Sequence, residues 1–105
     1  MKCIQQLSDK IKDEIKDAHE YASLALNLRD SDKDHAELYY TLAQEELKHM
    51  EMLHAQVVKD IEAYRKEHGE PPADMMIKYN VIHKIHMDDA REVKLMLLLY
   101  KEGTK

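Results

Sequence analysis

Residues 43–53 read AQEELKHMEML, and two of these residues are polar where an apolar face is expected. On a helix, the apolar side of this region is formed by Leu42, Ala43, Met50, Leu53 and Val57. Helical periodicity places Glu46 and His49 inside that stripe. Because an unpaired buried carboxylate costs several kcal/mol, the two residues need a partner. The stretch therefore predicts either a polar contact that fixes helix register or a bound metal ion.

The composition favours a single helical domain over residues 1–105. There are only two Gly and two Pro, and 35% of the residues are charged, which is typical of long helices rather than of sheets with many turns. With six Tyr and neither Trp nor Phe, the core must be aliphatic and Met-rich. The predicted fold class is all-α.

Three helices are predicted, over about residues 3–29, 34–68 and 74–102. The seam of the first helix recurs at steps of four and three, and comprises Leu7, Ile11, Glu14, Ala18, Tyr21, Ala25 and Leu28. Asp34 and Glu37 form a candidate capping box for the second helix, which Gly69 is expected to end. The third helix has an apolar stripe of Tyr79, Ile82, Ala90, Val93, Leu97 and Tyr100.

The segment 94–100, KLMLLLY, is apolar on most sides of the third helix. We expect it to be largely buried, in part against a second copy of the chain.

A third polar residue, Glu14, is expected to lie beside the pair, because it is about as far from the turn between the first two helices as His49 is. Helices joined by a short turn pack antiparallel, so residues equidistant from the turn lie side by side. From Ser31, Glu14 is 17 residues back and His49 is 18 residues forward. Glu46 lies about 4.5 Å from that level, at 1.5 Å per residue. Glu51 and His54 repeat the same spacing but lie on a flank with Gln44 and Leu47, so we assign the site to Glu14, Glu46 and His49.

These residues resemble the first half of the ferritin-like superfamily, in the style of rubrerythrin. The resemblance spans about residues 7–65 and rests on two helix motifs, which comprise Glu14, Ala18, Tyr21, Ala43, Glu46, His49 and Leu53. In that superfamily a four-helix bundle holds two metal ions, usually iron, through two Glu and two E-x-x-H motifs. The resemblance implies that Glu14, Glu46 and His49 are metal ligands, with manganese and zinc as alternatives to iron.

The chain has three helices where such a site needs four. One solution is a homodimer, or a higher homo-oligomer, in which two copies of the first two helices form the bundle. Encapsulated ferritins, which are also built from half-bundles, are a precedent by resemblance. The other solution uses the third helix, where Glu92 lies at the height of His49 and is a tentative ligand. His86 is a second tentative ligand that could form a separate site with His83, although interface or surface positions are the commoner use of such histidines.

The resemblance implies oxidation of iron(II) by dioxygen or peroxide, of the ferroxidase or peroxidase type, but the residues do not distinguish these activities from storage. The alternative is a metal-free helical oligomerisation or scaffold module, in which the polar groups only specify register.

Charge and termini limit the partners. The net charge of −5 and the lack of a basic patch argue against nucleic acid. No apolar run of about 20 residues or signal peptide is present, so we expect a cytoplasmic protein without membrane insertion. Cys3 is the only cysteine and cannot form an intrachain disulfide.

Overall fold

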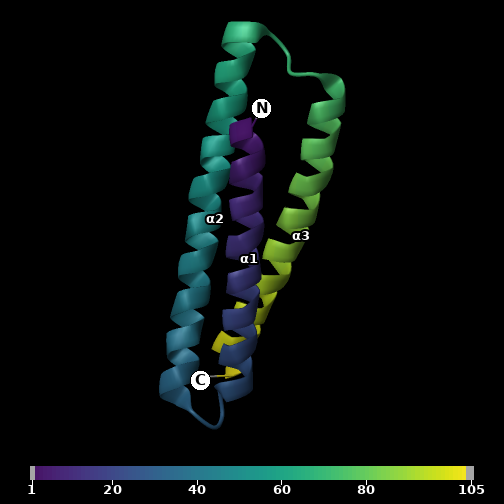
Figure 1. The fold of residues 1–105 in the computed structure, drawn as a ribbon. Helices are drawn as coiled ribbons and strands as arrows, with labels where there is room; N and C mark the ends of the chain where they lie inside the picture. The colour runs from purple at the N-terminus through teal and green to yellow at the C-terminus, as the bar shows by residue number, and fades with distance from the viewer. Residues whose placement is uncertain (1, 104–105) are drawn as a thin grey trace.

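The protein consists of three long helices in its computed structural model, which describes residues 2–103. They are α1 (Lys2–Leu28), α2 (Lys33–His68) and α3 (Ala73–Gly103). Helices α1 and α2 form an antiparallel hairpin, and α1 lies between α2 and α3 (Figure 1). The all-α class is confirmed, and each predicted helix end falls within one residue of the observed one. No described helix is long and apolar enough to cross a membrane.

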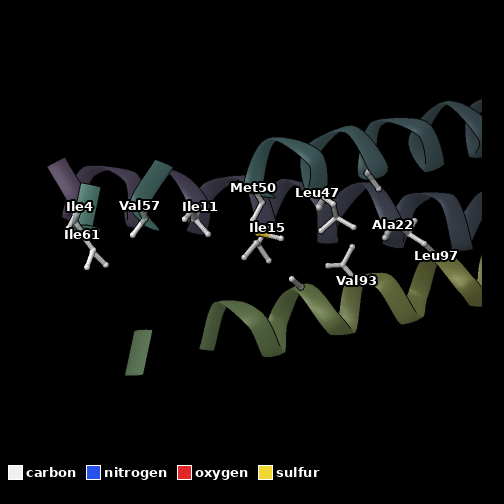
Figure 2. Close-up of a cluster of buried hydrophobic side chains, with 13 residues drawn as sticks. Ile4, Ile11, Ile15, Ala22, Leu47, Met50, Val57, Ile61, Val93 and Leu97 are labelled. Atoms are coloured by element: carbon white, nitrogen blue, oxygen red, sulfur yellow. The ribbon is translucent and has the colours of Figure 1, made fainter. Parts of the chain in front are cut away.

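An aliphatic core runs along the three helices (Figure 2). Its larger members are Ile4, Ile11, Ile15, Leu47, Met50, Val57, Ile61, Val93 and Leu97. The predicted seam is correct at Ile11, Ala18 and Ala25, which are buried, but it omitted the buried Ile15. The assignment of Leu47 to a flank was wrong, because Leu47 is buried. It continues the four-three spacing from Ala43 to Met50, so the core face of α2 lies beside Glu46 rather than on it.

The N-terminus of α2 is capped by Asp32, and the predicted cap at Asp34 was wrong. The Asp32 side chain accepts a hydrogen bond from the backbone N–H of His35, at 3.2 Å. Asp32 has the non-helical backbone that a cap requires, whereas Asp34 already lies inside the first turn. There its negative charge interacts favourably with the positive end of the helix dipole.

Replacement of Asp32 by Ala tests whether Asp32 or Asp34 is the capping residue. Asp32→Ala is expected to cost about 1 kcal/mol, because it leaves an N–H donor of the first turn without its partner. For a domain of this size that corresponds to a fall in Tm of roughly 4–8 °C. Asp34→Ala is the matched control and should lower Tm by less than half as much in the same calorimetric scan. Equal losses would contradict the assignment.

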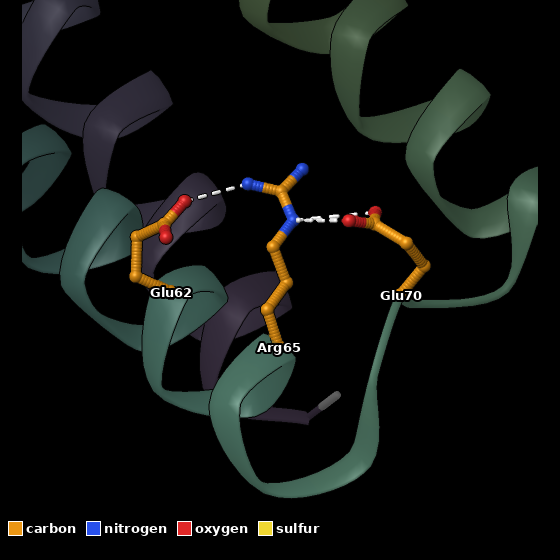
Figure 3. Close-up of polar contacts among 3 residues, drawn as sticks. All are labelled: Glu62, Arg65 and Glu70. Atoms are coloured by element: carbon orange, nitrogen blue, oxygen red, sulfur yellow. Dashed lines mark hydrogen bonds and ion pairs between the residues drawn. The ribbon is translucent and has the colours of Figure 1, made fainter.

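The C-terminus of α2 is closed by Gly69, as predicted. Gly69 has a φ of 79°, a left-handed conformation that favours glycine, and its N–H donates to the carbonyl of Arg65 at 3.0 Å. Arg65 also bridges two acids, with its Nη1 2.6 Å from Glu62 and its Nε 3.2 Å from Glu70 (Figure 3). These contacts fix the chain where it leaves α2 for α3.

Helix α3 packs on α1 and makes little contact with α2. Its C-terminal half is anchored to the hairpin, because Val93 and Leu97 join the core and Tyr100 stacks on Tyr40 with ring centroids 4.7 Å apart. Arg29 adds a hydrogen bond from its Nη1 to the carbonyl of Leu99 at 3.3 Å.

The expected burial of the segment 94–100 holds within one chain only for Leu97 and Tyr100. The other leucines, Leu95, Leu98 and Leu99, are exposed. The helix touches the hairpin along one face only, so an all-round apolar segment must leave side chains outside.

Candidate metal centre

Three side chains of the hairpin converge at its middle. Nδ1 of His49 lies 3.4 Å from Oε2 of Glu14 and 3.9 Å from Oε1 of Glu46. Each residue offers one ligand atom, and these atoms all lie within 4.8 Å of one another. Among residues 2–103, this is the one group of three or more His, Cys, Asp or Glu side chains with that geometry. Glu14, Glu46 and His49 are named the triad below.

Local helix geometry explains the meeting. Glu46 and His49 are at i and i+3 of α2, so both project from one side of the helix. Glu14 comes from the antiparallel α1 at the same height, as the distance from the turn predicted. The two glutamates are largely covered, with side chains 24% and 18% exposed, whereas His49 is 55% exposed. The triad is therefore seated in the hairpin but open to solvent on one side.

The two carboxyl groups are too close for both to ionise easily. The pKa of Glu46 is raised to about 7 by its hydrogen bond with Glu14, by burial and by the negative charge of Glu14, and His49 offsets this only in part. Oε2 of Glu14 is buried and makes no hydrogen bond, although Nδ1 of His49 lies 3.4 Å from it. Glu46 therefore keeps its proton up to about pH 7, while Oε2 of Glu14 remains without a hydrogen bond.

This arrangement fits a cation. A bound metal ion would satisfy the orphaned oxygen of Glu14, would neutralise the two carboxylates and would use the imidazole nitrogen that already faces them. Carboxylates combined with imidazole suit iron, manganese or zinc. Three protein ligands on one side would also leave coordination positions open toward solvent.

The tentative ligand Glu92 is not brought to the triad. Its Oε1 lies 3.7 Å from Nε2 of His19 on α1. His19 is five residues after Glu14, which places it about 140° around the helix. Glu92 therefore does not lie on the side of α1 that carries Glu14, although its predicted height is that of His49, because α3 packs on another face of α1.

His86, the other tentative ligand, is buried between helices and is not in the triad either. It is only 7% exposed, so the expected surface position is not observed, although an interface position is. Burial lowers the pKa of His86, and Lys12 adds to this while Asp89 opposes it. His86 borders a groove of about 710 Å³ between the N-terminal halves of α1 and α3. None of the triad lines that groove.

Sequence reasoning missed the histidine contact between α2 and α3. The rings of His54 and His83 stack with centroids 4.6 Å apart. The ring of Tyr79 also stacks on His83, with centroids 5.8 Å apart. Burial lowers the pKa of His83, and the nearby His54 and His86 contribute. His54 belongs to the second E-x-x-H spacing, with Glu51, which is exposed. The same spacing thus serves packing at one place and a ligand-like cluster at another.

Comparison with known protein families, with curated proteins and with solved structures gives no match for this chain. The candidate centre therefore rests on its own geometry and chemistry.

Proposed function

We propose that the chain is a ferritin-like di-metal carboxylate protein that binds iron(II) and oxidises it with dioxygen or peroxide. The observation that carries this proposal is the convergence of Glu14, Glu46 and His49, with the pKa of Glu46 raised to about 7 and an oxygen of Glu14 left without a donor. Two covered carboxylates that repel each other are unfavourable without a cation.

A homodimer would complete the centre. The triad supplies two carboxylates and one imidazole, which is half of the ligand set of a ferritin-like bundle. Its open side also carries one exposed apolar residue, Leu38, which is 51% exposed and lies eleven residues, about three turns, before His49. A two-fold partner packed on this side of the hairpin would cover Leu38 and would bring a second triad to the first.

The roles of the residues follow from their positions. Glu46, which lies next to both other residues, would be the shared carboxylate ligand, Glu14 would be a terminal carboxylate ligand, and the His49 of each chain would supply one imidazole ligand through Nδ1. Because the pKa of Glu46 is raised to about 7, iron must displace a proton from Glu46 below that pH, and iron affinity should therefore fall as the pH drops below about 7. Oε2 of Glu14 is buried, which keeps bulk water from that oxygen.

The redox step needs two electrons, and two iron(II) ions supply one each. With dioxygen and two protons the product is hydrogen peroxide, whereas hydrogen peroxide and two protons give two molecules of water. Both reactions leave two iron(III) ions as product. The oxidant would have to reach iron(II) from the solvent-open side of the triad, where His49 is 55% exposed.

Aerobic oxidation of iron(II) tests the activity. The initial rate, followed by the absorbance of the ferric product, is expected to fall on the order of 100-fold in Glu46→Ala, since loss of a direct ligand should cost at least as much as loss of an outer-shell partner. Glu51→Ala is the matched control, because it removes the exposed acid of the second E-x-x-H spacing. Its rate should match the parent protein within about twofold. Equal rates for Glu46→Ala and the parent would refute the proposal.

A further inference from the structure

The outward side of α3 carries a stripe of regularly spaced residues that is apolar at both ends and charged in its middle. Ile77, Val81, Leu95 and Leu99 are 64%, 57%, 57% and 48% exposed. Val93 and Leu97 are the buried residues on either side of Leu95, and a step of two residues turns a helix by about 200°. The stripe therefore lies directly opposite the face that packs on the hairpin, and no described part of the chain covers it.

The spacing of this stripe is symmetric about its centre. From Ile77 the steps through Val81 and Lys84 to Asp88 are four, three and four residues. From Asp88 the steps through Glu92 and Leu95 to Leu99 are again four, three and four. A face with the same spacing in both directions is self-complementary about a two-fold axis, which is the requirement for an isologous interface.

The charges on the stripe select one orientation. In an antiparallel pair centred on Asp88, Ile77 faces Leu99 and Val81 faces Leu95 of a second copy, while Lys84 faces Glu92. In a parallel pair, Lys84 and Glu92 would each face their own kind, which is unfavourable. The two Asp88 residues meet at the axis, but each already has Nζ of Lys84 and Nη1 of Arg91 of its own chain 3.4 Å away.

We infer that the outward side of α3 binds a second copy of the same chain, with the two α3 helices packed antiparallel about Asp88. The interface extends over the 23 residues from Ile77 to Leu99, whose Cα atoms span about 33 Å of helix. It also covers Leu95 and Leu99 of the segment 94–100, which the hairpin leaves exposed. The stripe faces away from the hairpin and includes none of the triad, so this interface does not depend on the proposed metal function.

Disulfide cross-linking tests the register. In a Cys3→Ser background, Asp88→Cys is expected to cross-link to its counterpart on mild oxidation with diamide, because the two residues meet at the axis. Val81→Cys alone should not cross-link, since two copies of residue 81 would be 14 positions, or about 21 Å, apart. Val81→Cys combined with Leu95→Cys should cross-link. The readout is a band of twice the chain mass on a non-reducing gel. The experiment is done with EDTA present and is repeated in the Glu46→Ala background, so that a dimer formed through the metal centre does not contribute.

Cross-linking of Val81→Cys alone as efficiently as the double variant would contradict the antiparallel register. A failure of both Asp88→Cys and the double variant would overturn the interface. Leu95→Glu provides an independent measurement, because it places a charge in the middle of the apolar contact and is expected to weaken self-association about tenfold or more in sedimentation velocity. Lys94→Glu is its control, since Lys94 is exposed and lies off the stripe; unchanged association of Leu95→Glu would also overturn the inference.

Discussion

Iron(II) or manganese(II), added without oxygen at about 100 times its dissociation constant, is expected to raise the Tm of the protein by roughly 10–20 °C. Binding to the folded state alone stabilises it by about 2.7 kcal/mol at that excess. In a domain of this size, each kcal/mol shifts Tm by roughly 4–8 °C. The physical source is the relief of repulsion between Glu14 and Glu46, whose carboxyl groups share a hydrogen bond in the metal-free chain. Differential scanning calorimetry under nitrogen measures the shift.

The same measurement on variants assigns the shift to the triad. Glu46→Ala should show less than a quarter of the rise, whereas Glu51→Ala, on the exposed part of α2, should retain it. A rise of equal size in the parent and in Glu46→Ala would locate the bound metal elsewhere. No rise in any of them would favour the metal-free scaffold.

The stability of the metal-free protein is expected to fall as the pH rises from about 4.5 to about 7. Over that interval the unfolded chain loses the proton of Glu46 at its ordinary pKa of 4.5, while the folded protein retains it until about pH 7. Stability decreases with pH wherever the folded state binds more protons. Glu46→Gln removes this penalty, and in EDTA at pH 8 it should be more stable than the parent by about 1–3 kcal/mol, after allowance for partial solvent screening.

Urea unfolding at pH 5 and pH 8 checks this second prediction. The advantage of Glu46→Gln should shrink strongly at pH 5, where the parent keeps the proton, and Glu45→Gln is the control because Glu45 is exposed on the same helix. The lowered pKa values of His83 and His86 act in the opposite direction, with stability lost as the pH falls through about 6.5, but they are common to all three proteins. An advantage of equal size at both pH values would show that the repulsion between Glu14 and Glu46 is not its cause.

The helix ends and the triad were predictable because both follow from spacing along one or two adjacent helices. Gly69 marks the end of α2, where φ is positive, and glycine tolerates this conformation because it has no Cβ. The contact between Glu14 and His49 needed only an antiparallel hairpin with a short turn, since equal distance from that turn then fixes equal height.

The remaining errors concern rotation around a helix axis, which height does not fix. Glu92 has the height of His49, but α3 packs on the face of α1 that carries His19. The same choice of face buries His86, so its predicted interface position is observed and its alternative surface position is not. The cap of α2 was misplaced for a different reason, because Asp30, Asp32 and Asp34 all have capping side chains and only the backbone of the folded turn selects Asp32.

Native mass spectrometry of the iron-loaded protein tests the central claim most directly. To separate the two interfaces, the measurement uses Leu95→Glu, in which pairing through α3 is disrupted. We expect a species of two chains with two iron ions. In the double variant Leu95→Glu/Glu46→Ala, both this dimer and its iron should be lost. An iron-free chain under saturating iron(II), or iron retained when Glu46 is replaced, would contradict it.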